Sequence, residues 1–207
     1  MKKYVIAFAL MVSGVFTFAQ STNFTYGISG GVGISQLQFS QIDDLPFYSN
    51  DPIVGYQVSA LLDYRVGESW GISVEPGYAR RGGQLGILPG MTNLNTRIKL
   101  DYVRLPILFS LYPREYVSIS VGPELSYLAD SNIDFLNMIA SPIENKFSLG
   151  VSAGVDFHFD APVSIGVQYN RNLTPLSSLN INEFGPFSGT KINLYNQNIS
   201  LVARITI

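Results

Sequence analysis

Large apolar side chains alternate with small or polar ones along most of this chain, from about residue 24 to the last residue. Successive side chains of a β-strand point to opposite faces, so each alternating stretch predicts a strand with one continuously apolar face. In the stretch that begins at Val117, for example, valine, isoleucine and leucine alternate with serine, glycine and glutamate. We expect eight strands, at about 24–35, 53–64, 70–80, 97–111, 116–128, 147–158, 163–171 and 197–207.

The connections between these strands alternate in length. The long ones cover 36–52, 81–96, 129–146 and 172–196, and the short ones cover 65–69, 112–115 and 159–162. Outer-membrane barrels have short periplasmic turns and longer extracellular loops. The pattern therefore predicts such a barrel, with both chain ends on the periplasmic side.

The chemistry of the two faces indicates which one meets lipid. Only 14% of the residues are charged, and those within the strands share a face with glycine and serine. The interior of an eight-stranded barrel is barely wide enough for side chains, so the large apolar residues fit better outside, against lipid. Tyrosines and Trp70 near the strand ends are typical of interfacial girdles. We predict an all-β fold, an eight-stranded antiparallel, up-and-down transmembrane β-barrel.

The first residues predict export. Lys2 and Lys3 precede an apolar run over 4–18, and small residues follow near Ala19, which is the layout of a secretory signal peptide. We expect a signal peptide at 1–19, a barrel domain at 20–207 and an outer-membrane location. The chain contains no cysteine, which excludes disulfides and thiolate metal sites, and no basic stripe, so nucleic acid is not an expected partner.

Four motifs are similar to a known family. They are Ser73-Val-Glu-Pro-Gly-Tyr-Ala-Arg-Arg-Gly-Gly83, Tyr102-Val-Arg-Leu-Pro-Ile-Leu-Phe109, Gly122-Pro-Glu-Leu-Ser-Tyr-Leu128 and Tyr169-Asn-Arg-Asn-Leu173. In this order they resemble the PorT-type, porin-family outer-membrane β-barrels of Bacteroidota. The resemblance implies an outer-membrane barrel. It implies no shared catalytic activity, and it points to roles in secretion or outer-membrane assemblies.

Strand parity places five charged residues in the barrel interior: Glu75, Arg104, Glu124, Asp156 and Arg204. Spacing about the turn near Pro113 predicts that Arg104 and Glu124 lie opposite each other on neighbouring strands. Buried ions require partners, so we expect a lumenal network of the five with Tyr102, Gln57 and Gln168. A polar core that fills the barrel is the interpretation that we favour over an ion path or an acid–base pair.

The connection over 172–196 carries more apolar side chains than a solvated loop needs: Leu173, Leu176, Leu179, Ile181, Phe184 and Phe187. We expect this segment to cover the barrel mouth or to contact a partner.

Three functions stay open on the sequence. The first is a non-enzymatic structural or accessory subunit, docked to another outer-membrane or surface assembly in secretion, transport or membrane biogenesis. The second is a narrow channel or small-ligand binder that uses Glu75, Arg104 and Glu124. The third is an outer-membrane lipid hydrolase built on His158, the single histidine, which requires a serine within hydrogen-bond reach. We expect outer-membrane lipid as a partner, and no cofactor, metal or catalytic residue.

Overall fold

A computed structural model describes residues 23–40, 48–87, 95–132, 146–181 and 190–207. The expected signal peptide lies outside these residues and stays a prediction. The described residues form eleven strands: β1 (Phe24–Phe39), β2 (Tyr48–Asp51), β3 (Ile53–Arg65), β4 (Trp70–Val74), β5 (Gly77–Ile87), β6 (Asn95–Arg114), β7 (Val117–Asn132), β8 (Phe147–His158), β9 (Val163–Asn172), β10 (Ser177–Ile181) and β11 (Thr190–Thr206). No helix in these residues is long and apolar enough to cross a bilayer.

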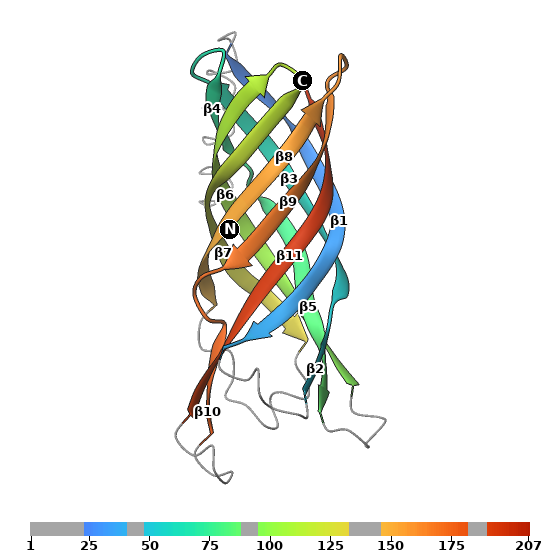
Figure 1. Cartoon of the computed structure of the whole chain (residues 1–207), viewed down its shortest axis with the longest axis vertical. Coiled ribbons are helices and arrows are strands. Elements are labelled where there is room, and N and C mark those ends of the chain that lie inside the picture. The colour runs from blue at the N-terminus through green and yellow to red at the C-terminus, as the bar shows by residue number, and fades with distance from the viewer. Residues whose placement is uncertain (1–22, 41–47, 88–94, 133–145, 182–189) are drawn as a thin grey trace, which may run out of the picture.

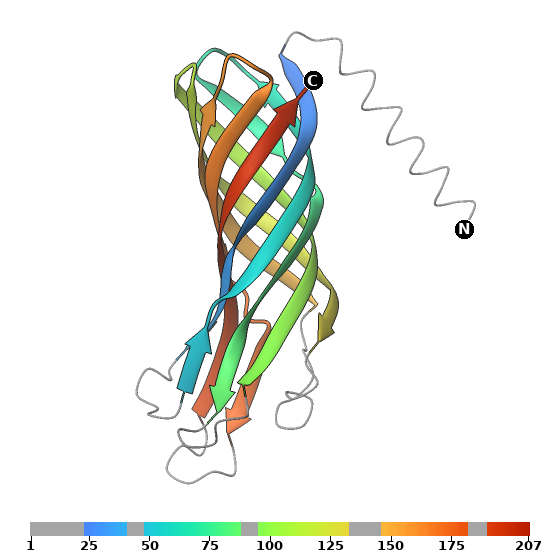
Figure 2. The ribbon, with the colours of Figure 1, turned by 90° about the vertical axis from the view of Figure 1, so that its right-hand side faces the viewer.

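The strands close into a ring in which every neighbouring pair is antiparallel (Figures 1 and 2). β1 pairs with β3 on one side and with β11 on the other, which joins the two ends of the sheet. β4 and β5 together occupy one position in the ring. β3 pairs with both of them in the same register, although they are separated by an interruption at Glu75 and Pro76. Pro76 has no N–H for the ladder, which explains the break. The ring thus has eight positions and confirms the predicted eight-stranded barrel.

The two faces of the barrel differ as the alternation predicted. Serine, asparagine, glutamine and ion-paired side chains are buried inside, whereas valine, isoleucine, leucine and aromatic side chains are exposed outside. Aromatic pairs mark both ends of this outer face. The rings of Trp70 and Phe109 lie 5.7 Å apart near the short turns, and those of Tyr127 and Phe147 lie 5.3 Å apart toward the long connections. These positions match the headgroup levels of a membrane barrel.

The short turns and the carboxyl terminus lie at one end of the ring, and the strand ends that flank the long connections lie at the other (Figure 1). The strands extend further into the expected long connections than the sequence suggested. β7 continues to Asn132, β11 already begins at Thr190, and β10 pairs with β11 as a hairpin. The predicted connection over 172–196 was therefore too long, because serine and asparagine at these positions weakened the alternation without preventing strand pairing.

The extracellular part of the lumen is filled by an apolar cluster that we name the apolar plug: Leu37, Ile98, Leu100, Tyr102, Leu128, Leu176 and Leu194. Two glycines of β5 make room for it. A Cβ on Gly83 would lie 3.0 Å from Leu37 Cγ, and Gly82 has a φ of 148°, a conformation that other residues rarely adopt. A Cβ on Gly82 would also collide with the carbonyl oxygen of Ile98. Glycine at position 83 therefore leaves space for Leu37 of the plug, and glycine at position 82 lets β5 pack against the Ile98 backbone of β6.

We predict that Gly82→Ala lowers the free energy of unfolding by about 2 kcal/mol or more, because the new methyl group meets backbone at a strained φ. Urea unfolding of the barrel in detergent micelles measures this change. Gly67→Ala is the matched control, since Gly67 lies in a turn where a Cβ would have no other atom within 4 Å. Equal stability of the two variants would contradict the need for glycine at position 82.

Candidate functional site

Glu124 of β7 collects most of the polar contacts in the middle of the lumen. Its Oε1 lies 2.8 Å from Arg81 Nη1, and its Oε2 lies 3.1 Å from Arg104 Nη2. Three further groups donate hydrogen bonds to this carboxylate, the hydroxyls of Ser126 and Ser152 and the amide of Asn170. Glu124 is 1% exposed, so these contacts replace the water that a buried carboxylate has lost.

A second group of ions lies closer to the periplasmic end. The Arg204 guanidinium contacts Glu75 Oε1 at 3.1 Å and forms an ion pair with Asp156. Arg104 also donates to Gln57, and Gln57 donates to Gln168 at 2.7 Å, which extends the first group to β3 and β9.

The six buried ions balance in formal charge. Three cations face three carboxylates, and we name this set the central ion layer: Arg81, Arg104, Arg204, Glu75, Glu124 and Asp156. A buried ion without a partner costs several kcal/mol, so neutrality of the set is a condition for closing the barrel around it. The glycine-rich β1 adds no ion. A Cβ on Gly31 would lie 2.8 Å from the carbonyl oxygen of Leu201, so β1 needs glycine there to pack against β11.

The structure brings together the five charged residues selected from strand parity and adds Arg81. The predicted third strand ended at residue 80, which placed Arg81 in a loop. In the structure β5 runs on to Ile87, and Arg81 lies on the same inward parity as Glu75. The alternation of inward and outward side chains, continued one residue beyond the predicted end of the strand, identifies Arg81 as an inward residue. Tyr102 contacts this layer through its ring, whose centroid lies 5.9 Å from Arg81 Cζ.

The predicted register of Arg104 and Glu124 was wrong by two residues. Arg104 lies opposite Ser126, and Glu124 lies opposite Pro106. At the β6–β7 turn, Arg114 pairs with Val117, and the register shifts between Leu111 and Arg114. The prediction was based on a longer turn. The ion pair forms diagonally, since diagonal neighbours on adjacent strands lie within reach of long side chains.

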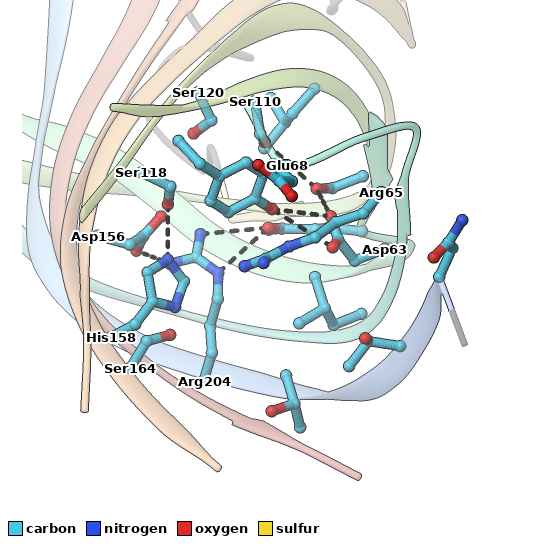
Figure 3. A pocket seen from close by; sticks show the side chains of 18 of the residues that line it. Asp63, Arg65, Glu68, Ser110, Ser118, Ser120, Asp156, His158, Ser164 and Arg204 are labelled. Carbon is cyan, nitrogen blue, oxygen red and sulfur yellow. Dashed lines mark hydrogen bonds and ion pairs between the residues drawn. The ribbon is translucent and has the colours of Figure 1, made fainter. Parts of the chain in front are cut away.

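A polar cavity of about 550 Å³ occupies the periplasmic end of the lumen (Figure 3). His158 lies on its wall, and its Nε2 is 2.9 Å from Ser118 Oγ. Asp63 and Arg65 line the opposite side, where Asp63 accepts hydrogen bonds from Ser73 and Tyr112. A serine thus lies within reach of the histidine. No carboxylate among the described residues is hydrogen-bonded to His158, so the arrangement lacks the acid that orients the base in a Ser-His-acid triad.

The residues expected to contact a partner separate into three groups. Leu173 is 56% exposed, whereas Leu176 is buried in the apolar plug, so the expectation that Leu176 offers a contact surface was wrong. The side chains of Leu179 and Ile181, and all of Phe184 and Phe187, lie outside the described residues. Leu176 is buried because β10 folds back along β11 and carries the preceding residues over the lumen.

We predict that Glu124→Gln lowers the free energy of unfolding by about 3 kcal/mol, because two buried arginines lose their common counter-ion. Urea unfolding in micelles, followed by circular dichroism, measures the change. Glu115→Gln is the control, since it makes the same substitution at an exposed position of the β6–β7 turn. A loss below about 0.5 kcal/mol for Glu124→Gln would refute its central role.

One family of outer-membrane proteins matches this sequence. The sequence matches the outer membrane protein beta-barrel domain family over residues 18–178. No curated protein sequence matches it significantly. Among solved structures, Ail of Yersinia pestis has 16% identity and a TM-score of 0.48, with 90% of this chain and 100% of that chain covered. OprG of Pseudomonas aeruginosa has 10% identity and a TM-score of 0.48, with 89% and 94% covered. Because the family match covers more than half of the 207 residues, this chain belongs to the outer membrane protein beta-barrel domain family, and its location is the outer membrane.

Proposed function

We propose that this protein is a non-enzymatic barrel that serves as a structural or accessory subunit, docked to another outer-membrane or cell-surface assembly. The observation that carries the proposal is the filling of the lumen. In the described part of the chain, the central ion layer and the apolar plug occupy successive levels between the periplasmic cavity and the extracellular end. Because its lumen is filled in this way, the barrel acts through its outer surfaces.

The alternative of a channel receives less support from the same geometry. A solute path through the barrel has to pass Glu75, Arg104 and Glu124, and each of these is 1% exposed. Their charges are used in contacts with each other and with Arg81 and Arg204. Opening a path requires breaking several of these ion pairs at once, which is costly in a buried site.

The alternative of a hydrolase also receives less support. Ser118 and His158 are hydrogen-bonded, but they lie at the periplasmic end, away from the outer leaflet. The third member of a triad is missing from the described contacts of His158. We therefore interpret the pair as part of the polar wall of the cavity.

Two features favour a docking role. The β10–β11 hairpin and the β2–β5 pair project beyond the ring at the extracellular end (Figure 1). Leu173, at the base of the first projection, is an exposed apolar side chain at the end of β9. The resemblance of the sequence motifs to PorT-type barrels favours secretion among the assemblies that such a subunit serves.

Gentle detergent extraction from native outer membranes, followed by sizing and mass spectrometry, tests this proposal. We expect a complex larger than one barrel with a defined partner. We further expect Leu173→Asn to lower the amount of partner that co-purifies about fivefold, because the substitution removes an exposed apolar contact at the interface. Val66→Asn in the β3–β4 turn is the matched control at the opposite end. Elution of a lone barrel from the wild-type membranes would overturn the docking role.

A further inference from the structure

The periplasmic cavity has the size of a small-molecule site. Its volume of about 550 Å³ lies within the range of about 300–1,000 Å³ that is usual for ligand pockets. Its walls come from the periplasmic ends of the strands and from the β3–β4 turn, and they are rich in hydroxyl and charged groups. The central ion layer forms its inner end through Glu75, Asp156 and Arg204.

Two buried polar atoms of residues that line this cavity have no hydrogen-bond partner among the described residues. They are Glu75 Oε2 and Ser120 Oγ, on side chains that are 1% and 4% exposed. An unpaired buried polar atom costs about 1–3 kcal/mol, and more if it is charged. An ionised carboxylate only accepts hydrogen bonds, so the group that satisfies Glu75 has to be a donor.

The charges of the residues that line the cavity indicate the sign of the charge on its ligand. Four carboxylates line the cavity, those of Asp63, Glu68, Glu75 and Asp156, against the two arginines Arg65 and Arg204. Both arginines already have partners. Arg204 is paired with Glu75 and Asp156, and the Arg65 guanidinium lies 4.1 Å from the centroid of the Tyr112 ring. A net charge of −2 with the cations engaged favours a cation over an anion.

The arrangement of the carboxylates favours an organic cation over a metal ion. No group of three or more metal-ligating side chains converges within the described residues. Asp63 accepts a hydrogen bond from the Ser73 hydroxyl at 2.5 Å, and Ser73 precedes Glu75 by two residues, with both side chains buried. Carboxylates that are separated in this way suit an organic ligand that carries its N–H donors on a carbon chain.

We propose that the periplasmic cavity binds a small organic ammonium or guanidinium compound through the carboxylates of Glu75 and Asp63. Binding supplies the donor that Glu75 Oε2 lacks and offsets the negative charge of the lining. The site opens at the short-turn end, so its ligand comes from the periplasm. This inference is independent of the proposed docking role, which concerns the opposite end of the barrel.

The single histidine provides a direct readout, because His158 lines the cavity. We would titrate the untagged protein in micelles with butane-1,4-diamine and follow the imidazole signals of His158 by NMR. Butane-1,4-diol and succinate are the neutral and anionic four-carbon controls. We expect a saturable shift with the diamine, and binding of the diol and succinate at least about tenfold weaker, since charge-assisted hydrogen bonds are lost.

Two variants locate the site. Asp63→Asn is expected to weaken diamine binding about tenfold, whereas Asp130→Asn, the same change at the extracellular end of β7, is expected to leave it unchanged. Gel migration without heating verifies that both variants are folded. The absence of a saturable shift, equal binding of succinate, or equal effects of the two variants would each overturn the proposal. None of these outcomes bears on the sizing experiment for docking.

Discussion

The interior of an eight-stranded ring is too narrow for a water-filled pore, so every ion placed there has to find its partner in protein. This constraint governs the present barrel. Glu124 is ion-paired with two arginines and accepts hydrogen bonds from two serines and an asparagine, and Arg204 contacts two carboxylates. The layer joins the strands around most of the ring, and the outer face is free to meet lipid with apolar side chains alone.

The lumen changes character along its axis. A polar cavity at the periplasmic end leads to the central ion layer, and the apolar plug fills the extracellular part. Except for Leu176, the plug lies within strands that run further than the alternation predicted, and it supports the projecting β10–β11 hairpin through Leu176 and Leu194. The two tasks that we propose, binding of a small ligand and contact with a partner, thus belong to opposite ends of the barrel.

Residue parity predicted the barrel and the inward position of five ions, because a strand leaves only two directions for a side chain. It missed Arg81 only because the predicted strand stopped one residue before it. The register between neighbouring strands was harder to predict. The pairing of Arg104 with Ser126 depends on the length of the turn and on a register shift, neither of which the alternation encodes. The polar cavity was also missed, since it depends on which inward side chains are small enough to leave space.

Cysteine accessibility tests the closed lumen most directly, because the natural chain has no cysteine. Thr25 lines the periplasmic cavity, whereas Ser152 contacts Glu124 and is fully buried. We predict that Thr25→Cys reacts rapidly with a small, water-soluble thiol reagent on the folded barrel, and that Ser152→Cys reacts only after unfolding. Rapid reaction of a folded Ser152→Cys variant would mean that water reaches the central ion layer, and would contradict a closed lumen.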